Sequence, residues 1–241
     1  PEGHPDREPD DKDKPDFKTK AGLNRATWDL RYQEVAWPSG ARFDTGAPEP
    51  GPMAAPGEYT VRLTVDGSSS TRPLSIEIDP RSSATVADIQ SQVAFVLGGR
   101  GHLDRITAMV ETIRGIREQL VDRNERLSGD PETVELVASG ERLITGLTTV
   151  EEAIHNPHAE VDYDILGGRH GGAKLWSRLA WLFDTAQQHD GPPTQGMIEV
   201  AEVLGTELGA QEKIFDTLVG GDLAELNALA AKKGVPYVVT P

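Results

Sequence analysis

The stretch Pro56-Gly-Glu-Tyr-Thr-Val-Arg-Leu-Thr-Val-Asp-Gly67 decides how the first third of this 241-residue chain is interpreted. Apolar and polar side chains alternate along it with the period of two that is typical of a β-strand. The apolar set is Tyr59, Val61, Leu63 and Val65. The closing Asp66-Gly67 pair is a strong signal for a tight hairpin turn. Beyond residue 85 the apolar period lengthens to that of amphipathic helices, so we expect a β module joined to a helical module.

The β module is predicted to cover residues 21–81 and to form a small immunoglobulin-like or fibronectin-like β-sandwich. A second alternating run, Thr71–Asp79, follows the turn, and Pro73 near its start favours an edge position. An earlier run, Asn24–Tyr32, places Trp28, Leu30 and Tyr32 on one face. Two sheets packed face to face would bury these alternating residues. A module of about 60 residues is small for seven strands, so we expect the sandwich to be incomplete or completed by neighbours.

The helical module is predicted to cover residues 82–241 as an antiparallel up-and-down bundle. Thr85 and Asp88 form a capping-box-like pair at its start. A long helix then follows from two apolar rows: Ile106, Ile113, Leu120 and Leu127 recur every seven residues, and Leu103 and Val110 fill the intervening row. We expect a kink or break at Gly98, Gly99 and Gly101, because glycine is a poor helix former.

Short turns separate the remaining predicted helices. Gly129-Asp130-Pro131 makes the first turn, and the second helix runs to about His155. One row of this helix is Leu136, Leu143 and Val150, and the other is Gly140, Leu147 and Ile154. A third helix is expected at about 173–188, and a fourth begins at the capping residue Thr194. Gly220-Gly221 should end the fourth helix, with Asp222 capping a short last one. The fold class is therefore α+β and multidomain, with residues 1–20 as a disordered or extended acidic linker.

Composition narrows the possible partners and the compartment. The formal net charge is −15, so nucleic acid and anionic lipid are poor partners for this chain. The chain has no cysteine, which excludes disulfides, thiolate metal sites and cysteine nucleophiles. It has no apolar run of about eighteen residues, so no direct membrane span is predicted. Because it starts at Pro1 without an initiator Met, we expect a mature, trimmed or partly observed polypeptide.

Three segments together resemble a known family. They are Asn24-Arg-Ala-Thr-Trp-Asp-Leu-Arg-Tyr32, then Ala55–Gly67, then Pro73 through Asp79-Pro80-Arg81 leading into a helix. This arrangement resembles the C-terminal region of exported bacterial proteins known as sortilin-like or BNR-repeat glycosyl hydrolases. In that family a β-propeller precedes a small β-sandwich and a helical tail. The tail here, from Asp222-Leu-Ala-Glu-Leu to Lys233-Gly-Val-Pro236, is also similar.

The resemblance implies a location and a supporting role. It implies export, to the periplasm, the cell surface or the extracellular space, and a protein partner such as the upstream propeller. Propellers of that family carry repeated Asp-box turns, Ser-x-Asp-x-Gly-x-x-Trp, and none occurs in this chain. Any family activity would reside on the missing propeller, so no catalytic residue is carried over to this sequence.

Four groups of residues are candidate sites, and none gives a catalytic, cofactor-binding or metal-binding prediction. His155, His158, Asp162 and Asp164 have ligand chemistry, but Pro157 separates the histidines and no metal-motif spacing appears. Gly167-Gly-Arg-His-Gly-Gly172 precedes a helix but lacks the Gly-Lys-Ser/Thr of a phosphate loop. Glu151-Glu152 are adjacent on one helix and so point about 100° apart. A last group holds the aromatic residues Trp176, Trp181 and Phe183. We expect them to pack in the core or between the modules, in preference to forming a binding surface.

The sequence therefore predicts a non-catalytic accessory or structural module of an exported bacterial protein, which mediates protein–protein contact or supports an upstream β-propeller. One alternative is an independent accessory subunit of a periplasmic or cell-surface assembly. Another is a glycan hydrolase, which would need two carboxylates at a defined separation across a cleft. No cofactor is predicted for any of these roles.

Overall fold

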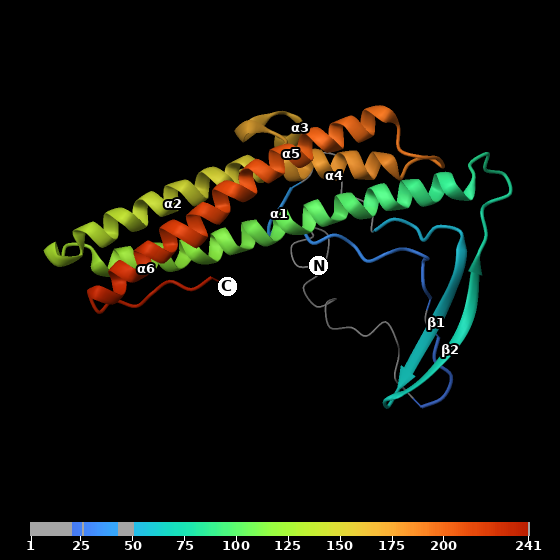
Figure 1. The fold of residues 1–241 in the computed structure, drawn as a ribbon, viewed down its shortest axis with the longest axis horizontal. Coiled ribbons are helices and arrows are strands. Elements are labelled where there is room, and N and C mark those ends of the chain that lie inside the picture. The colour runs from blue at the N-terminus through green and yellow to red at the C-terminus, as the bar shows by residue number, and fades with distance from the viewer. Residues whose placement is uncertain (1–20, 26, 43–50, 241) are drawn as a thin grey trace.

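A single long helix, α1 (Val86–Leu127), forms the spine of the molecule (Figure 1). The computed structural model describes residues 21–25, 27–42 and 51–240; the predicted linker 1–20 lies outside them. At the start of α1 the Thr85 hydroxyl accepts a hydrogen bond from the Asp88 amide, and the Asp88 carboxylate accepts one from the Thr85 amide. The predicted capping box is therefore confirmed.

The predicted break at Gly98, Gly99 and Gly101 is wrong, because α1 is continuous over its 42 residues. Packing against a neighbouring helix explains why glycine stands at position 99. A Cβ added at Gly99 would lie 2.1 Å from the Phe183 ring of α4 (Leu175–Ala186). Glycine here allows two helices to approach closely, and the cost in helix propensity, about 1 kcal/mol, is offset by that contact.

Gly98 and Gly99 should therefore respond in opposite directions to alanine. We expect Gly99→Ala to lower the free energy of unfolding by about 1–3 kcal/mol through overpacking against Phe183. Gly98 has open space around its Cβ position. Gly98→Ala should raise stability by up to about 1 kcal/mol. Urea denaturation of the two variants measures both effects, and equal midpoint shifts would contradict this assignment.

Four further helices pack with α1 around one apolar core, which we call the bundle. They are α2 (Val134–Ile154), α4, α5 (Gln195–Thr217) and α6 (Leu223–Lys232). α2 follows a 3₁₀ turn at Pro131–Thr133 and runs back along α1 (Figure 1). The short α3 (Asp162–Leu166) and a 3₁₀ turn at Arg169–Gly171 connect α2 to α4.

The core of the bundle confirms the predicted apolar rows of α1 and α2. Fully buried side chains include Ile106, Ile113, Leu120, Leu136, Leu147, Ile154, Leu204 and Leu208. The side chain of Leu127, at the end of the α1 row, is only partly buried. Since such a stripe must be removed from water, its burial along most of α1 explains how so long a helix is stabilised.

The predicted boundary between the last two helices is wrong. A π-helical turn, Leu218–Asp222, joins α5 to α6 without a break in the helical backbone. Gly220 and Gly221 therefore lie inside a continuous helical path, and Asp222 makes no side-chain capping bond. The wider π turn keeps the backbone amides hydrogen bonded through the glycine pair. Thr194 does cap α5 as predicted, accepting from the Met197 amide at 3.2 Å.

The predicted β-sandwich is contradicted. The described residues contain one two-stranded antiparallel sheet, formed by β1 (Gly57–Val65) and β2 (Ser68–Ile76). No second sheet lies over it there, so neither a sandwich nor an immunoglobulin-like fold is present in that part of the chain. Alternation specifies a strand with two unlike faces; it does not supply the second layer that would bury one of them.

The run Asn24–Tyr32 is not a strand, which also removes a sheet member that the sandwich required. Leu30 has a φ of 65°, a left-handed conformation that interrupts an extended backbone. What remains is an isolated bridge between Arg31 and Met53. Two backbone hydrogen bonds support it, from the Tyr32 amide to Pro52 O (2.9 Å) and from the Ala54 amide to Leu30 O (2.6 Å).

Residues 36–39, which we call the Trp37 segment, are held against α1 by hydrogen bonds. The Pro and Gly residues around them predict only an irregular stretch of chain. The amides of Ala36 and Ser39 donate to Asp104 Oδ1 (2.9 Å) and Glu111 Oε1 (2.7 Å). The Trp37 side chain is buried and lies 5.4 Å from the Trp176 ring, centroid to centroid. This contact ties the N-terminal part of the described chain to the bundle.

Candidate functional site

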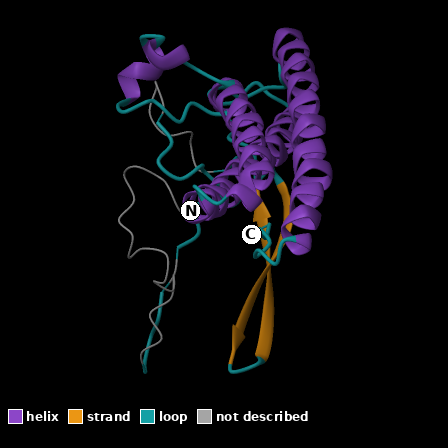
Figure 2. Cartoon of the chain, turned by 90° about the vertical axis from the view of Figure 1, so that its left-hand side faces the viewer, coloured by secondary structure: helices purple, strands orange, loops and turns teal. Residues whose placement is uncertain are grey.

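Most residues of the β1–β2 hairpin are exposed, and the hairpin extends away from the bundle (Figure 2). Its turn is closed by Asp66 and Gly67, both at positive φ (48° and 80°), which matches the predicted Asp-Gly turn and the twist of a two-residue hairpin. The register then pairs Val65 with Ser68 and Gly57 with Ile76.

One face of the hairpin is polar. The other, which we call the apolar face, carries the apolar side chains of β1 beside Ser68, Ser70 and Arg72 of β2. On the polar face Thr64 and Ser69 share a hydrogen bond (2.8 Å), and Ser75 donates to Glu58 (2.6 Å). On the apolar face, Val61, Leu63 and Val65 are 49%, 46% and 56% exposed. The sequence predicts these three side chains to be buried beneath a second sheet, and the structure leaves them about half exposed. An open row of apolar side chains is a candidate surface for contact with another body.

The apolar face is covered only at its base. There Tyr59, Leu74 and Ile76 are partly buried, and the Tyr59 hydroxyl donates to Ala55 O (2.7 Å). Partial burial and the neighbouring Tyr32 raise the pKa of Tyr59. A groove of about 370 Å³ opens at this base, between the bridge, the end of β2, the start of α1 and the end of α4. Its lining includes Met53, Ile76, Ile89, Gln92 and Asp190.

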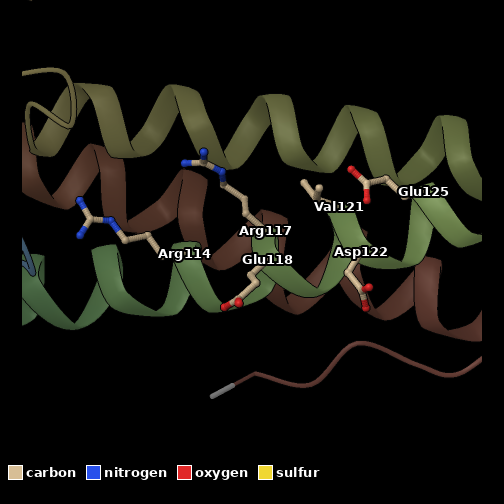
Figure 3. A pocket seen from close by; sticks show the side chains of 6 residues that line it. All are labelled: Arg114, Arg117, Glu118, Val121, Asp122 and Glu125. Atoms are coloured by element: carbon tan, nitrogen blue, oxygen red, sulfur yellow. The ribbon is translucent and has the colours of Figure 1, made fainter.

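A second, shallow groove of about 410 Å³ lies along the C-terminal half of α1 (Figure 3). Its lining is Arg114, Arg117, Glu118, Val121, Asp122 and Glu125. Both arginines form ion pairs with the buried carboxylate of Glu151 on α2. Arg114 Nε lies 2.7 Å from Glu151 Oε1, and Arg117 Nη1 pairs with Glu151 Oε2. Because the cations are already paired and three acidic residues share the lining, the groove is not an anion site.

The Glu151 cluster joins three parts of the chain. Arg114 also donates from Nη1 to Ser39 O at 2.6 Å, so one guanidinium links α1, α2 and the Trp37 segment. The Glu151 side chain is 2% exposed, whereas the adjacent Glu152 is half exposed and pairs with His158 (2.9 Å). The two carboxylates thus have different surroundings, and Glu151 serves as a packing and pairing group.

His155 follows this cluster at the end of α2 and is buried. Burial, and secondarily the positive charge of Arg114, lower its pKa from 6.5 to about 4. The neutral imidazole is therefore the form that the fold accommodates. Above about pH 6.5 the burial of neutral His155 does not lower the free energy of unfolding through proton binding, because this imidazole is neutral in the unfolded chain as well.

Acidification should therefore destabilise the fold through His155. Between pH 6.5 and 4 the unfolded chain binds a proton at this residue and the folded chain does not. We expect this residue to make the free energy of unfolding about 2 kcal/mol lower at pH 5 than at pH 7. Comparing urea midpoints of the wild type and His155→Met across this range isolates the effect. If both chains lose stability equally, His155 is not the group responsible.

The structure does not assemble the histidines and aspartates into a metal site. Asp164 accepts from the Val161 and Glu160 amides at 3.1 Å each, and the Val161 bond is the main cause of its lowered pKa. His158 pairs with Glu152, and His155 is buried separately. Within residues 21–25, 27–42 and 51–240, no three His, Cys, Asp or Glu side chains group closely enough to hold a metal ion.

The glycine-rich loop 167–172 is held by the end of α2. Asn156 Nδ2 donates to Gly172 O at 2.9 Å, and the Asn156 side chain is buried in doing so. Within the loop, His170 has a φ of 52°, in the left-handed region that glycine tolerates better. The loop is therefore explained as a connection between α2 and α4 that this hydrogen bond holds in place.

The aromatic residues of α4 confirm the packing interpretation in two of three cases. Trp176 is buried and donates from Nε1 to Thr107 Oγ1 at 3.2 Å. Phe183 is buried against Phe95, with ring centroids 5.2 Å apart. Trp181 points outward and is half exposed. Their spacing on one helix could not show which side would be covered.

Sequence reasoning missed one buried cation. Arg123 of α1 is 6% exposed, and burial lowers its pKa. Its Nη2 donates to Asn124 Oδ1 at 3.4 Å, while Nε and Nη1 have no hydrogen-bond partner among the described residues. The spacing could have indicated it, because Arg123 lies three residues after Leu120 and four before Leu127, and side chains three and four apart share one face of a helix.

Comparison with known proteins gives this geometry no relative. No family model matches the chain, and no curated protein and no solved structure matches it. Among the described helices, none is both long and apolar enough to cross a membrane. The hairpin and the groove at its base therefore stand as the candidate site on structural grounds alone.

Proposed function

We propose that this chain is a non-catalytic accessory module of an exported bacterial protein and that its hairpin makes the protein–protein contact. The observation that carries the proposal is the open apolar row of Val61, Leu63 and Val65 on a hairpin that the bundle holds away from itself (Figure 2). An isolated two-stranded hairpin is at best marginally stable in water. A partner that covers this face would stabilise it.

The bundle suits a supporting role. Its core is continuous along α1, and the Glu151 cluster and the Trp37 segment add polar and aromatic contacts between distant parts of the chain. The base of the hairpin lies next to this body, because Ile76 of β2 lines the same groove as Ile89 and Gln92 of α1. The bundle can therefore serve as the support of a contact element.

The resemblance to the C-terminal region of sortilin-like propeller proteins supplies one partner, the upstream propeller of the same gene product. The alternative partner is a subunit of a periplasmic or cell-surface assembly. Glycan hydrolysis has less support, because it needs two carboxylates that face each other across a cleft. Glu151 is buried between two arginines, and Glu152 pairs with His158.

Site-specific crosslinking tests the proposal. A photo-crosslinking residue at Leu63 in the natural-length protein should form an adduct with protein, mapped by mass spectrometry to upstream residues or to another subunit. The matched control is Val134, which is 65% exposed at the start of α2. Equal crosslinking from both positions would contradict the proposal. Glycan hydrolysis by the isolated chain, abolished by one carboxylate substitution, would also overturn it.

A further inference from the structure

The two outer edges of the hairpin are not equivalent. In a two-residue hairpin the residues that flank the turn, here Val65 and Ser68, form a hydrogen-bonded pair. Alternation along the ladder then directs the backbone groups of every second residue outward. On β1 the outward residues are Glu58, Thr60, Arg62 and Thr64, and all four are exposed. Each offers both an amide and a carbonyl to another strand.

The outer edge of β2 is interrupted. By the same register its outward residues are Ser69, Thr71, Pro73 and Ser75. Pro73 has no amide hydrogen, so one donor is missing from the middle of this edge. A proline on an edge is a common protection against strand pairing. β1 has no proline between Gly57 and Val65, so its edge offers an uninterrupted row of amides and carbonyls over that span.

The sequence of β1 is complementary to itself when two copies run antiparallel with Thr60 on the two-fold axis. Outward residues then pair with outward residues. Glu58 lies directly opposite Arg62 of the second copy, and this occurs twice. On the apolar face Tyr59 lies opposite Val61 of the second copy, also twice. Opposite charges and aromatic–β-branched pairs are both favourable cross-strand neighbours.

Charge favours the hairpin as the meeting point of two copies. The chain carries a net charge of −15, so two bundles repel each other. Residues 57–76 contain two arginines, Arg62 and Arg72, and two carboxylates, Glu58 and Asp66, and are therefore neutral. The hairpin extends away from the helices (Figure 2), and antiparallel pairing places the two bundles at opposite ends of the joint sheet.

We propose that two copies of this chain pair through the outer edge of β1, antiparallel about Thr60, to form a four-stranded sheet. This inference rests on the proposed role of the hairpin as a contact element and names a second copy as the partner. The symmetric pairing makes the contact isologous, so it closes at a dimer.

Sedimentation velocity over a concentration series tests the pairing. We expect a reversible dimer for the wild type. Thr60→Pro should raise its Kd at least about tenfold, because it removes two edge hydrogen bonds on the axis and leaves the β1–β2 ladder intact. Thr71→Pro removes an outward amide from the β2 edge and is the matched control, expected to dimerise like the wild type. Circular dichroism checks that both variants keep the fold.

Charge exchange tests the register. Arg62→Glu should weaken the dimer at least about tenfold, because it sets two glutamate pairs opposite each other. The double variant Glu58→Arg/Arg62→Glu should restore the Kd to within about threefold of the wild type. A wild type that stays monomeric at about 0.1 mM would overturn the inference, as would equal effects of the two proline variants or no restoration by the double variant.

The outcomes also separate this inference from the proposed function. A monomer whose Leu63 crosslinks to another protein would remove the second copy as partner and leave the hairpin as a contact element. A monomer with no crosslink from Leu63 above the Val134 control would contradict both.

Discussion

Replacing Leu147 with alanine is expected to lower the free energy of unfolding by about 2–5 kcal/mol. The Leu147 side chain of α2 has no exposed surface and belongs, with Ile113 of α1, to the one apolar core of the bundle. Alanine loses the transfer free energy of the removed atoms and leaves a cavity that helices on several sides cannot close. Ile113→Ala should have an effect of similar size, because Ile113 is equally buried.

Urea denaturation at pH 7 measures this effect. The control is Val134→Ala in the same helix, where the side chain is 65% exposed and a change within about 0.5 kcal/mol is expected. A negligible shift of the midpoint for Leu147→Ala would show that this row of α2 does not pack in the core of the bundle.

The second large effect is expected at Glu151. Glu151→Gln removes the only carboxylate that pairs Arg114 with Arg117 across the α1–α2 contact, among the residues that the structure describes. It leaves two guanidinium groups close together and without that counter-charge. Breaking a buried pair on one side typically costs about 3–5 kcal/mol. Because both arginines are about one-third exposed, we expect the lower end, about 3 kcal/mol.

Glu152→Gln provides a matched control one residue away. Glu152 pairs with His158 at the surface, and both side chains are about half exposed. Its substitution should change the free energy of unfolding by less than about 0.5 kcal/mol. Thermal or urea unfolding of both variants gives the comparison. Equal effects would mean that burial does not distinguish the two carboxylates.

The helical half of the fold could be predicted from local signals because each signal acts over a few residues. The Thr85–Asp88 box, the Thr194 cap and the apolar rows of α1 and α2 all appear where the sequence places them. The role of glycine could not be predicted in this way. The sequence predicts a break of α1 at Gly99, but this glycine packs against Phe183, a residue that is distant in the chain.

The candidate site was only partly predictable for the same reason. The Asp66-Gly67 turn and the two faces of the hairpin follow from neighbouring residues. Whether a second layer covers the apolar face depends on the rest of the molecule, so the predicted sandwich failed there. The Glu151 cluster was also out of reach, since Ser39, Arg114 and Glu151 meet only when α1 packs between α2 and the Trp37 segment.

By itself the sequence determined the period of each segment, and with it the hairpin, the long capped helix and the rows that form the core. Periodicity and capping are properties of nearby residues, and the backbone hydrogen bonds that they direct are local. Only the tertiary structure decided which face of each element is covered, because burial depends on what packs against it. That is why Glu151 and Glu152, adjacent in sequence, have opposite surroundings, and why the alternating residues of β1 remain open to a partner.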